Sequence, residues 1–326
     1  MIIKINPSLL RRQEPSDFEI SSTTSVTGFP TQAFGNDSVF ILHAVYLRKN
    51  NRFLINRTRK INFLKTLFFL SLICFLNPSY ADAREDGLQA FKQGNYELAL
   101  NFWTPLAEAG DREIQYNLGV MYNDGRGVEK NILFAIKWLT EAANQNDADA
   151  QFRLGKLYLN EKETKENLQQ AEHWLRKAAL KNHATACYYL AQLYAHGKGV
   201  TKDNDLALRW YYRGAENNNI SSMYNLGYMH EVGQGVPKNL PEAFRWYDKA
   251  ARKGAADAQA NLGRLYFKGQ GVSRDKIMAF VWFKLAALQK NKTAENNAQF
   301  TFKQLNTKDQ QQALNLVSEY KEKFIP

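Results

Sequence analysis

The stretch ISSMYNLGYMHEVGQGVPKNLPEAFRWYDKAARKGA, residues 220–255, decides the fold of this chain of 326 residues, because other segments repeat its pattern. Leu226, Ala243 and Trp246 have counterparts at intervals of 36 residues on both sides. The counterparts are Leu118, Leu154, Leu190 and Leu262; Ala135, Ala171, Ala207 and Ala279; and Trp138, Trp174, Trp210 and Trp282. Five of the six tryptophans lie on this period, so the sequence predicts a repeat protein.

The first half of each repeat has the pattern of an amphipathic helix. Leu226, Met229 and His230 are spaced by three and four residues, which places them on one stripe of a helix. Gly227, beside this leucine, is matched by a glycine or an alanine in every other repeat. A glycine inside a helix costs up to ~1 kcal/mol relative to alanine, so its recurrence predicts that a neighbouring helix packs closely at this point.

A Gly-x-Gly-Val sequence follows this helix in four repeats, beginning at Gly125, Gly197, Gly233 and Gly269. We expect the first glycine to end the helix in the left-handed conformation. The repeat at residues 148–183 has glutamates in both glycine positions but keeps its length, so we expect its hairpin to persist with a different turn. A phosphate-binding glycine loop would need a preceding strand, and the sequence before these loops is not strand-like.

The second half of each repeat predicts another helix, which runs from Pro241 to Ala251 in the central repeat. Proline suits the first turn of a helix, and Ala243, Trp246 and Ala250 form one packing face. A single hairpin of this length cannot bury both of its faces, whereas stacked copies can. The sequence therefore predicts an all-α fold, a right-handed α-solenoid of antiparallel helical hairpins.

The motif A-x-x-x-x-L-G-x-x-Y … G-x-G-V … A-x-x-W-[YFL]-x-x-A-A resembles the Sel-1-like repeat (SLR), a relative of the tetratricopeptide repeat. The resemblance covers residues 112–291 as five repeats of 36 residues. These are residues 112–147, 148–183, 184–219, 220–255 and 256–291.

Two flanking segments complete the array. Residues 84–111 keep Ala99 and Phe102 at the repeat spacing but have a shorter turn, so they resemble a tetratricopeptide-like opening hairpin. Residues 292–326 lose the repeat signatures, and we expect capping helices there. Thr307 and Gln310 have the spacing of a capping box, which predicts that the last helix starts at this threonine.

Residues 62–83 are interpreted as a secretory signal peptide. Basic residues between Arg57 and Lys65 precede an apolar run over residues 66–76, and small residues stand at Ser79 and Ala81. We expect cleavage near Ala81 or Ala83 and a periplasmic or secreted mature protein. Because such signals lie at a true N-terminus, residues 1–61 are interpreted as an extension that is either disordered or translated from an upstream start, and we favour a start near residue 54.

Two alternatives to cleavage stay open. The apolar run extends over about 14 residues from Phe63, short of the ~20 that span a bilayer. A retained segment 62–76 would nevertheless anchor the chain in the inner membrane as a tethered assembly scaffold, and this segment is the only membrane contact that we expect. A lipoprotein would require a small residue before Cys74, where the chain has Ile73.

The charge of the chain does not favour nucleic acid as a partner. Of the net charge of +11, +6 falls in residues 1–81, which carry ten basic and four acidic side chains. The sequence contains no recognised nucleic-acid-binding motif. We therefore expect no nucleic-acid partner.

The sequence shows no pattern typical of a catalytic or metal site. The histidines lack metal-ligand spacing, no G-x-S-x-G occurs, and Cys187 occupies an ordinary helix position. We expect no catalytic residue, no cofactor and no metal. Some cysteine-rich proteins that resemble this repeat are linked to penicillin binding and hydrolysis. This chain lacks their paired cysteines, and a cell-wall or β-lactam-directed hydrolase is kept as an alternative.

In the related tetratricopeptide arrays, side chains opposite the core stripe of the first helix line a concave groove, and the resemblance implies the same here. At ~100° per residue, positions 116, 120 and 123 lie opposite Leu118, Met121 and Tyr122. Aromatic and long polar side chains at such positions suit protein or peptide recognition. The residues expected to line this surface, called the predicted groove below, are Tyr116, Phe152, Lys156, Tyr188, Gln192, Tyr224, Tyr228, Glu231, Arg264 and Phe267.

The first of these positions is aromatic in four repeats, and those rings could equally pack between adjacent helices. The second position varies most between repeats, which makes it the better candidate for specificity. It holds Val120, Lys156, Gln192, Tyr228 and Arg264. The function that we expect is that of a non-catalytic, exported adaptor that holds a protein or peptide partner in the predicted groove.

Overall fold

The computed structural model describes residues 80–325, and all regular structure within this range is helical. The opening helices are α3 (Tyr80–Lys92) and α4 (Tyr96–Glu108). The repeats contain α5 (Arg112–Asp124), α6 (Ile132–Asn144), α7 (Ala148–Asn160), α8 (Lys165–Leu180), α9 (Ala184–His196), α10 (Asn204–Glu216), α11 (Ile220–Val232), α12 (Leu240–Arg252), α13 (Ala256–Lys268) and α14 (Lys276–Leu288). The chain ends with α15 (Lys292–Phe302) and α16 (Thr307–Phe324).

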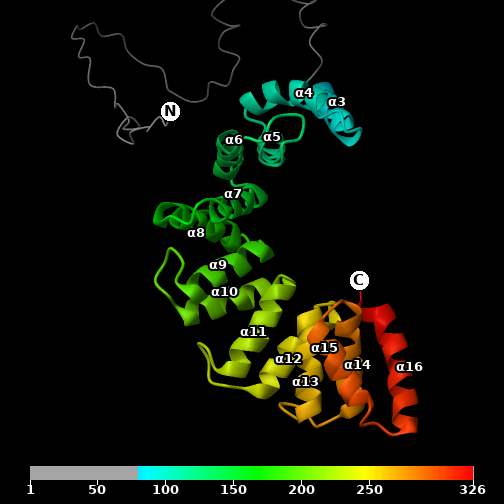
Figure 1. Ribbon diagram of the computed structural model, residues 1–326. Coiled ribbons are helices and arrows are strands. Elements are labelled where there is room, and N and C mark those ends of the chain that lie inside the picture. Colours follow the sequence, from blue (N-terminus) through cyan, green and yellow to red (C-terminus); the bar gives the residue numbers. More distant parts are fainter. Residues whose placement is uncertain (1–79, 326) are drawn as a thin grey trace, which may run out of the picture. The chain divides into compact units, whose positions relative to one another are not determined.

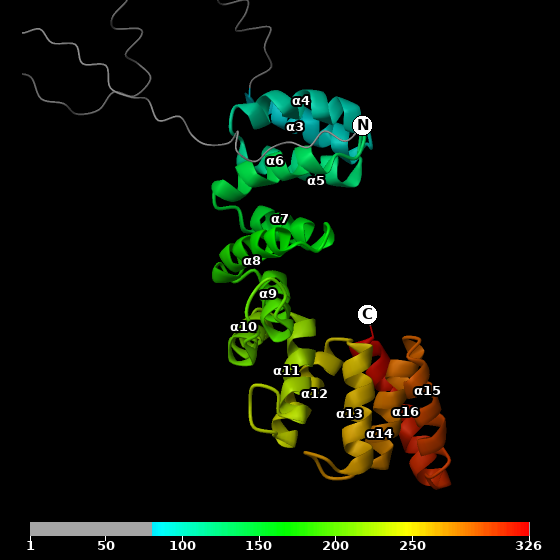
Figure 2. The same cartoon turned by 60° about the vertical axis from the view of Figure 1, so that its left-hand side comes forward.

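Each helix packs chiefly against its neighbours in the chain, so the hairpins follow one another as a stack (Figure 1). The turned view in Figure 2 shows the same order of hairpins from α3 and α4 to α13 and α14. The predicted fold class, an all-α solenoid of antiparallel helical hairpins, is confirmed. Helices α5, α7, α9, α11 and α13 are called the first helices below, and α6, α8, α10, α12 and α14 the second helices.

The periodic residues build the core, as the sequence predicts. All five periodic tryptophans are buried, and Ala243 and Ala250 have no exposed surface. The helices also approach closely at the recurring glycine. A Cβ on Gly227 would lie 2.7 Å from Cδ1 of Tyr247, and one on Gly119 would lie 2.6 Å from Cγ of Leu139. The small residue is therefore needed for the contact between the two helices of a hairpin.

The Gly-x-Gly-Val loops end the first helices and also touch the preceding hairpin. Gly125 caps α5 in the left-handed conformation, with φ +71°. Gly127 has φ +71° as well, and a Cβ on it would lie 2.5 Å from Cβ of Tyr96 at the start of α4. The first glycine thus serves the helix end, and the second serves the contact between hairpins.

The repeat without this loop keeps its hairpin, as predicted, and the structure shows how. Helix α7 ends with Glu161 in an extended conformation rather than a left-handed one. Helix α8 then begins at Lys165 and has 16 residues, whereas the other second helices have 13. Additional helix therefore replaces the missing glycine loop.

The C-terminal helices close the core, and α16 starts at Thr307 as predicted, although the capping residue is the one before it. The cap is Asn306, whose side chain accepts a hydrogen bond from the backbone nitrogen of Asp309. Thr307 is the first residue of the helix, and an asparagine in the preceding position competes effectively for this role. Phe324 of α16 stacks on Trp282 of α14, with ring centroids 5.8 Å apart.

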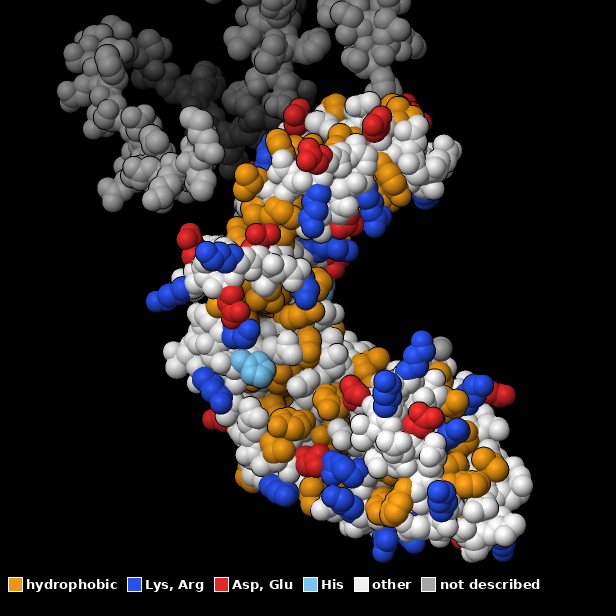
Figure 3. Space-filling view, in the orientation of Figure 1, with side chains coloured by type: hydrophobic (Ala, Val, Ile, Leu, Met, Phe, Trp, Pro, Cys, Tyr) orange, Lys and Arg blue, Asp and Glu red, His pale blue; other side chains and the backbone are white. Residues whose placement is uncertain are grey.

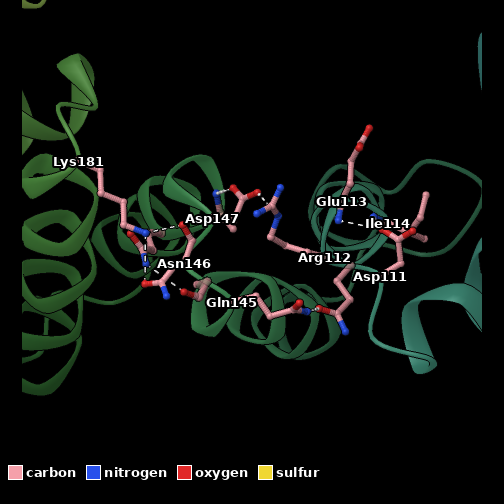
Figure 4. A network of polar contacts seen from close by, with 12 residues as sticks. Asp111, Arg112, Glu113, Ile114, Gln145, Asn146, Asp147 and Lys181 are labelled. Atoms are coloured by element: carbon pink, nitrogen blue, oxygen red, sulfur yellow. Dashed lines mark hydrogen bonds and ion pairs between the residues drawn. The ribbon is translucent and has the colours of Figure 1, made fainter. Parts of the chain in front are cut away.

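Polar contacts tie the first repeats to one another at the turns between hairpins (Figure 4). The Lys181 ammonium donates to the backbone carbonyl oxygen of Asn146, 35 residues earlier. Arg112, the first residue of α5, lies 3.4 Å from a carboxylate oxygen of Asp147, which caps α7. These contacts link consecutive repeats on the side where the chain passes from one hairpin to the next.

The predicted N-terminal extension and most of the predicted signal peptide lie outside the described residues. The two cleavage points, Ala81 and Ala83, fall in the first turn of α3. Among the helices that the structure describes, none combines the length and the apolar character required to cross a membrane.

Candidate protein-binding groove

The first helices carry all ten residues of the predicted groove. Nine of them are half-buried, and Tyr228 is exposed over 45% of its surface. Figure 3 shows one face of the array, where hydrophobic side chains lie among Lys and Arg side chains.

Side chains of the predicted groove contact residues of neighbouring repeats. Nε of Arg153 donates to the hydroxyl oxygen of Tyr116 at 3.0 Å. The Lys156 ammonium donates to the hydroxyl oxygen of Tyr189 at 2.6 Å and lies 4.0 Å from the centre of the same ring. These contacts fix long side chains on the surface of the first helices.

One position that takes part in these contacts does not belong to the predicted groove. Arg153, Tyr189 and Asn261 occupy equivalent places in their repeats, each directly after the first position of the predicted groove. The amide nitrogen of Asn261 lies 3.5 Å from the hydroxyl oxygen of Tyr224 in the preceding repeat. The change from arginine to tyrosine to asparagine at this position was a visible signal of a role outside the core.

The tyrosines of the first position partly pack between helices, which is one of the two roles that the sequence allows for them; the other is to line the predicted groove. The Tyr188 ring lies 6.2 Å from that of Tyr211 on the second helix, and the Tyr224 ring lies 5.7 Å from that of Tyr247. The Tyr188 hydroxyl nevertheless accepts a hydrogen bond of 2.7 Å from Gln192 on the same helix. These side chains therefore support the helix contacts and present polar groups at the same time.

A charged cluster occupies the boundary between α11 and α13. The Arg264 guanidinium lies 2.6 and 2.7 Å from the two carboxylate oxygens of Glu231. The Tyr247 hydroxyl donates to the same carboxylate at 3.0 Å. Burial, followed by the nearby carboxylate, raises the pKa of Tyr247. Glu231 and Arg264 thus neutralise each other within the predicted groove.

A pocket of about 250 Å³ lies between α5 and α7. Its apolar part comprises Val120, Leu139, Phe152 and Leu157. Arg153 and Lys156 belong to the same lining, so an apolar floor and two cationic groups occur together. Phe152 is held by stacking on the His183 ring, with centroids 4.4 Å apart.

Aromatic side chains lie at the C-terminal end of the predicted groove. Phe267 of α13 lies 6.0 Å from Phe300 of α15, measured between ring centroids. Phe300 occupies the position equivalent to Arg264 in the capping helix and is exposed over 59% of its surface. The Arg274 guanidinium lies 5.6 Å from the Phe267 ring centre. The row of second-position residues therefore continues beyond the five repeats.

Cys187 and His230 are titratable side chains that lie buried in the core. Cys187 is fully buried, and burial raises the pKa of its thiol to about 11. His230 is buried, and its Nε2 lies 2.7 Å from the Tyr212 hydroxyl oxygen. Burial lowers the pKa of this histidine. Within residues 80–325, no group of three or more His, Cys, Asp or Glu side chains has an arrangement that could hold a metal ion.

Comparison with protein families gives a match to the Sel1 repeat. Its family model matches residues 80–111, 113–147, 148–183, 184–219, 220–254 and 256–291. The first of these segments coincides with α3 and α4, so the family model treats the opening hairpin as a further repeat. Comparison with the curated proteins gives no match.

Solved structures of Sel1 repeat proteins are also similar. One from Oxalobacter formigenes is 31% identical, with 72% of this chain and 99% of that chain covered and a TM-score of 0.62. The protective antigen c5321 of uropathogenic Escherichia coli, which displays an SLR fold, is 26% identical, with coverages of 76% and 70% and a TM-score of 0.34. Cysteine rich protein B of Helicobacter pylori is 28% identical over 40% of this chain and 92% of that chain, with a TM-score of 0.33.

Proposed function

The chain belongs to the Sel1 repeat family, whose solenoids are scaffolds for protein–protein interaction, and we propose that it is a non-catalytic adaptor that binds a protein or peptide in the predicted groove. The observation that carries the proposal is the set of contacts across repeat boundaries. Arg153 and Lys156 are held by tyrosines of neighbouring repeats. A surface whose long side chains are already ordered loses less entropy when a partner binds.

The composition of the predicted groove supports a protein partner. Tyr228 of the predicted groove and Phe300 beside Phe267 offer exposed rings, and aromatic side chains are frequent anchors of protein interfaces. Half-buried charged and amide groups lie between them and can provide hydrogen bonds at defined places. A partner that lies along several repeats would contact both kinds of group.

The buried cysteine supports the non-catalytic part of the proposal. A nucleophilic cysteine requires a lowered pKa and access to substrate. Cys187 has a raised thiol pKa, about 11, and no exposed surface. The described residues thus offer no activated thiol to the hydrolase alternative, and a nitrocefin assay of the purified chain tests that alternative directly.

Export is the second part of the proposal and rests on the sequence of residues 62–83. We propose cleavage near Ala81 or Ala83 and a periplasmic or secreted adaptor. The intact mass of the protein purified from its own cells tests this. A mass beginning at residue 82 or 84 is expected, whereas a mass that includes residues 62–76 would support the membrane-tethered scaffold instead.

A crosslinked pull-down from an envelope extract tests the binding site. The full chain is compared with a Gln192→Ala/Tyr228→Ala variant, which changes two second-position side chains outside the core. The matched control, Arg209→Ala/Lys253→Ala, changes two exposed residues of the second-helix side, on α10 and after α12. We expect a protein that both the unchanged chain and the control capture and that the groove variant loses. Equal capture by all three would place the binding site elsewhere.

A further inference from the structure

The two cationic groups of the pocket between α5 and α7 are fixed in place but not neutralised. Arg153 donates to the Tyr116 hydroxyl at 3.0 Å, and Lys156 donates to the Tyr189 hydroxyl at 2.6 Å. No Asp or Glu carboxylate within residues 80–325 forms an ion pair with either of them. A neutral hydroxyl orders a cation without cancelling its charge, so both groups can still attract an anion.

The equivalent site three boundaries further along the array, between α11 and α13, is built differently. Arg264 occupies the same repeat position as Lys156, but it pairs with both carboxylate oxygens of Glu231. The residue equivalent to Glu231 at the α5–α7 boundary is Asn123, which lines the pocket and carries no charge. The carboxylate that neutralises the cation between α11 and α13 therefore has no counterpart between α5 and α7.

The shape of the pocket adds a second requirement. Its apolar part, formed by Val120, Leu139, Phe152 and Leu157, lies next to the two cations. A volume of about 250 Å³ is below the usual range for small-molecule sites and suits one or two side chains of a peptide. An occupant that satisfies both parts has a carboxylate for the cations and an apolar group for the floor.

We propose that this pocket binds an acidic peptide segment of the partner, in which an Asp or Glu side chain contacts Arg153 and Lys156 while an adjacent apolar side chain occupies the floor. The proposal rests on the proposed function and specifies the chemistry of the partner at one end of the predicted groove. A hydrogen bond between an ionised donor and a carboxylate is stronger than one between neutral groups. Lys156 is half-buried, so its contact with a carboxylate is also less screened by salt than one on an open surface, whereas Arg153 is exposed.

Selection from a phage-displayed library of random decapeptides on the immobilised full chain tests the proposal. We expect enrichment of peptides in which Asp or Glu stands beside Leu, Ile, Val or Phe. The most enriched peptide is then synthesised with a fluorescein label, and its affinity is measured by fluorescence anisotropy. Replacing its acidic residue by Asn or Gln should weaken binding at least tenfold, a result that does not depend on any change in the protein.

Variants of the chain give the complementary measurement. Arg153→Gln/Lys156→Gln should weaken binding of the acidic peptide at least tenfold, and Arg153→Lys/Lys156→Arg should retain most of the affinity. The control Arg209→Gln/Lys253→Gln removes the same number of charges elsewhere and should change the affinity less than twofold.

The outcomes separate this proposal from the proposed function. One outcome is that the selected peptides show no preference for Asp or Glu. If they also bind Arg153→Gln/Lys156→Gln as well as the unchanged chain but lose affinity for Gln192→Ala/Tyr228→Ala, the acidic pocket is overturned and the groove is supported. Peptides that none of these variants affects would overturn both the pocket and the groove. Failure to select any peptide would count against both as well.

Discussion

The ammonium nitrogen of Lys156 lies 2.6 Å from the hydroxyl oxygen of Tyr189, although the two residues belong to consecutive repeats. Glu231 and Arg264, which are also 33 residues apart, form another contact between consecutive repeats, although here the cation belongs to the later repeat. Side chains that face the predicted groove therefore also join one hairpin to the next. Binding and the stability of the solenoid depend on overlapping sets of residues, which the following predictions separate.

The Glu231–Arg264 pair should contribute measurably to stability. Arg264→Met leaves the carboxylate, 20% exposed, with only the Tyr247 hydroxyl as its hydrogen-bonding partner in this cluster. We expect a loss of ~1–3 kcal/mol in the free energy of unfolding, the range for a partly buried group that loses its partner. Glu231→Gln/Arg264→Met should cost less than the sum of the two single changes, as judged by urea midpoints in a double-mutant cycle.

An exposed ion pair provides the control for this cycle. Arg245 lies 3.3 Å from Glu242 on the same helix and is exposed over 73% of its side chain. Arg245→Met should change stability by less than ~1 kcal/mol, because water screens such pairs. Additivity of Glu231→Gln and Arg264→Met would show that their contact contributes nothing of its own.

The two glycines of the loop after α5 should respond differently to alanine. Both have φ +71°. A Cβ on Gly125 would meet its nearest atoms at 3.4 Å, so Gly125→Ala should cost the conformational penalty of roughly 1–2 kcal/mol. A Cβ on Gly127 would also lie 2.5 Å from Tyr96 and 2.9 Å from the backbone nitrogen of Glu97. Gly127→Ala should therefore lower the thermal midpoint further than Gly125→Ala, and equal effects would refute the proposed contact between hairpins.

The Cys187 thiol should be unreactive in the folded chain. Burial raises its pKa to about 11, so at pH 8 only ~0.1% of the thiol is the reactive thiolate. In a Cys74→Ser background, we expect reaction with Ellman's reagent at least roughly 100-fold more slowly in buffer than in 8 M urea. Rapid labelling of the folded chain at pH 8 would contradict the buried position and reopen the question of a reactive cysteine.

Alkaline pH should destabilise the array through its buried tyrosines. Burial, together with a hydrogen bond to Glu172, raises the pKa of Tyr194 to about 12, and burial raises the pKa of Tyr211. A phenol is neutral when protonated, so above the unfolded pKa of about 10 the folded state binds more protons than the unfolded state. This contribution to stability is complete below pH 10 and is lost as the pH rises toward 12.

The measurement for the tyrosines is the urea midpoint at pH 8 and at pH 11. We expect a lower midpoint at pH 11 and a smaller decrease in Tyr194→Phe, which removes one of the raised pKa values. A midpoint that does not change with pH, or that rises, would contradict the inferred environment of these rings.

The periodic residues were sufficient to predict the hairpins, because Leu226, Ala243 and Trp246 mark the faces that each hairpin must bury. The helix extension at Lys165 was not predictable, since a chain without a glycine stop can end its turn in several ways. The role of Tyr189 also depends on how neighbouring hairpins stack, which a period of 36 residues does not encode. Residues that act within a repeat were predicted better than those that act between repeats.

Photo-crosslinking tests the central claim, partner binding in the predicted groove, most directly. The photoreactive amino acid p-benzoylphenylalanine replaces Tyr228 in one full-length chain and Arg209 in another, and the cells are irradiated before the crosslinked species are identified by mass spectrometry. We predict one protein partner crosslinked from position 228, reduced in an Arg153→Gln/Lys156→Gln background and absent from position 209. The same partner crosslinked equally from both positions, or only from position 209, would contradict binding in the groove.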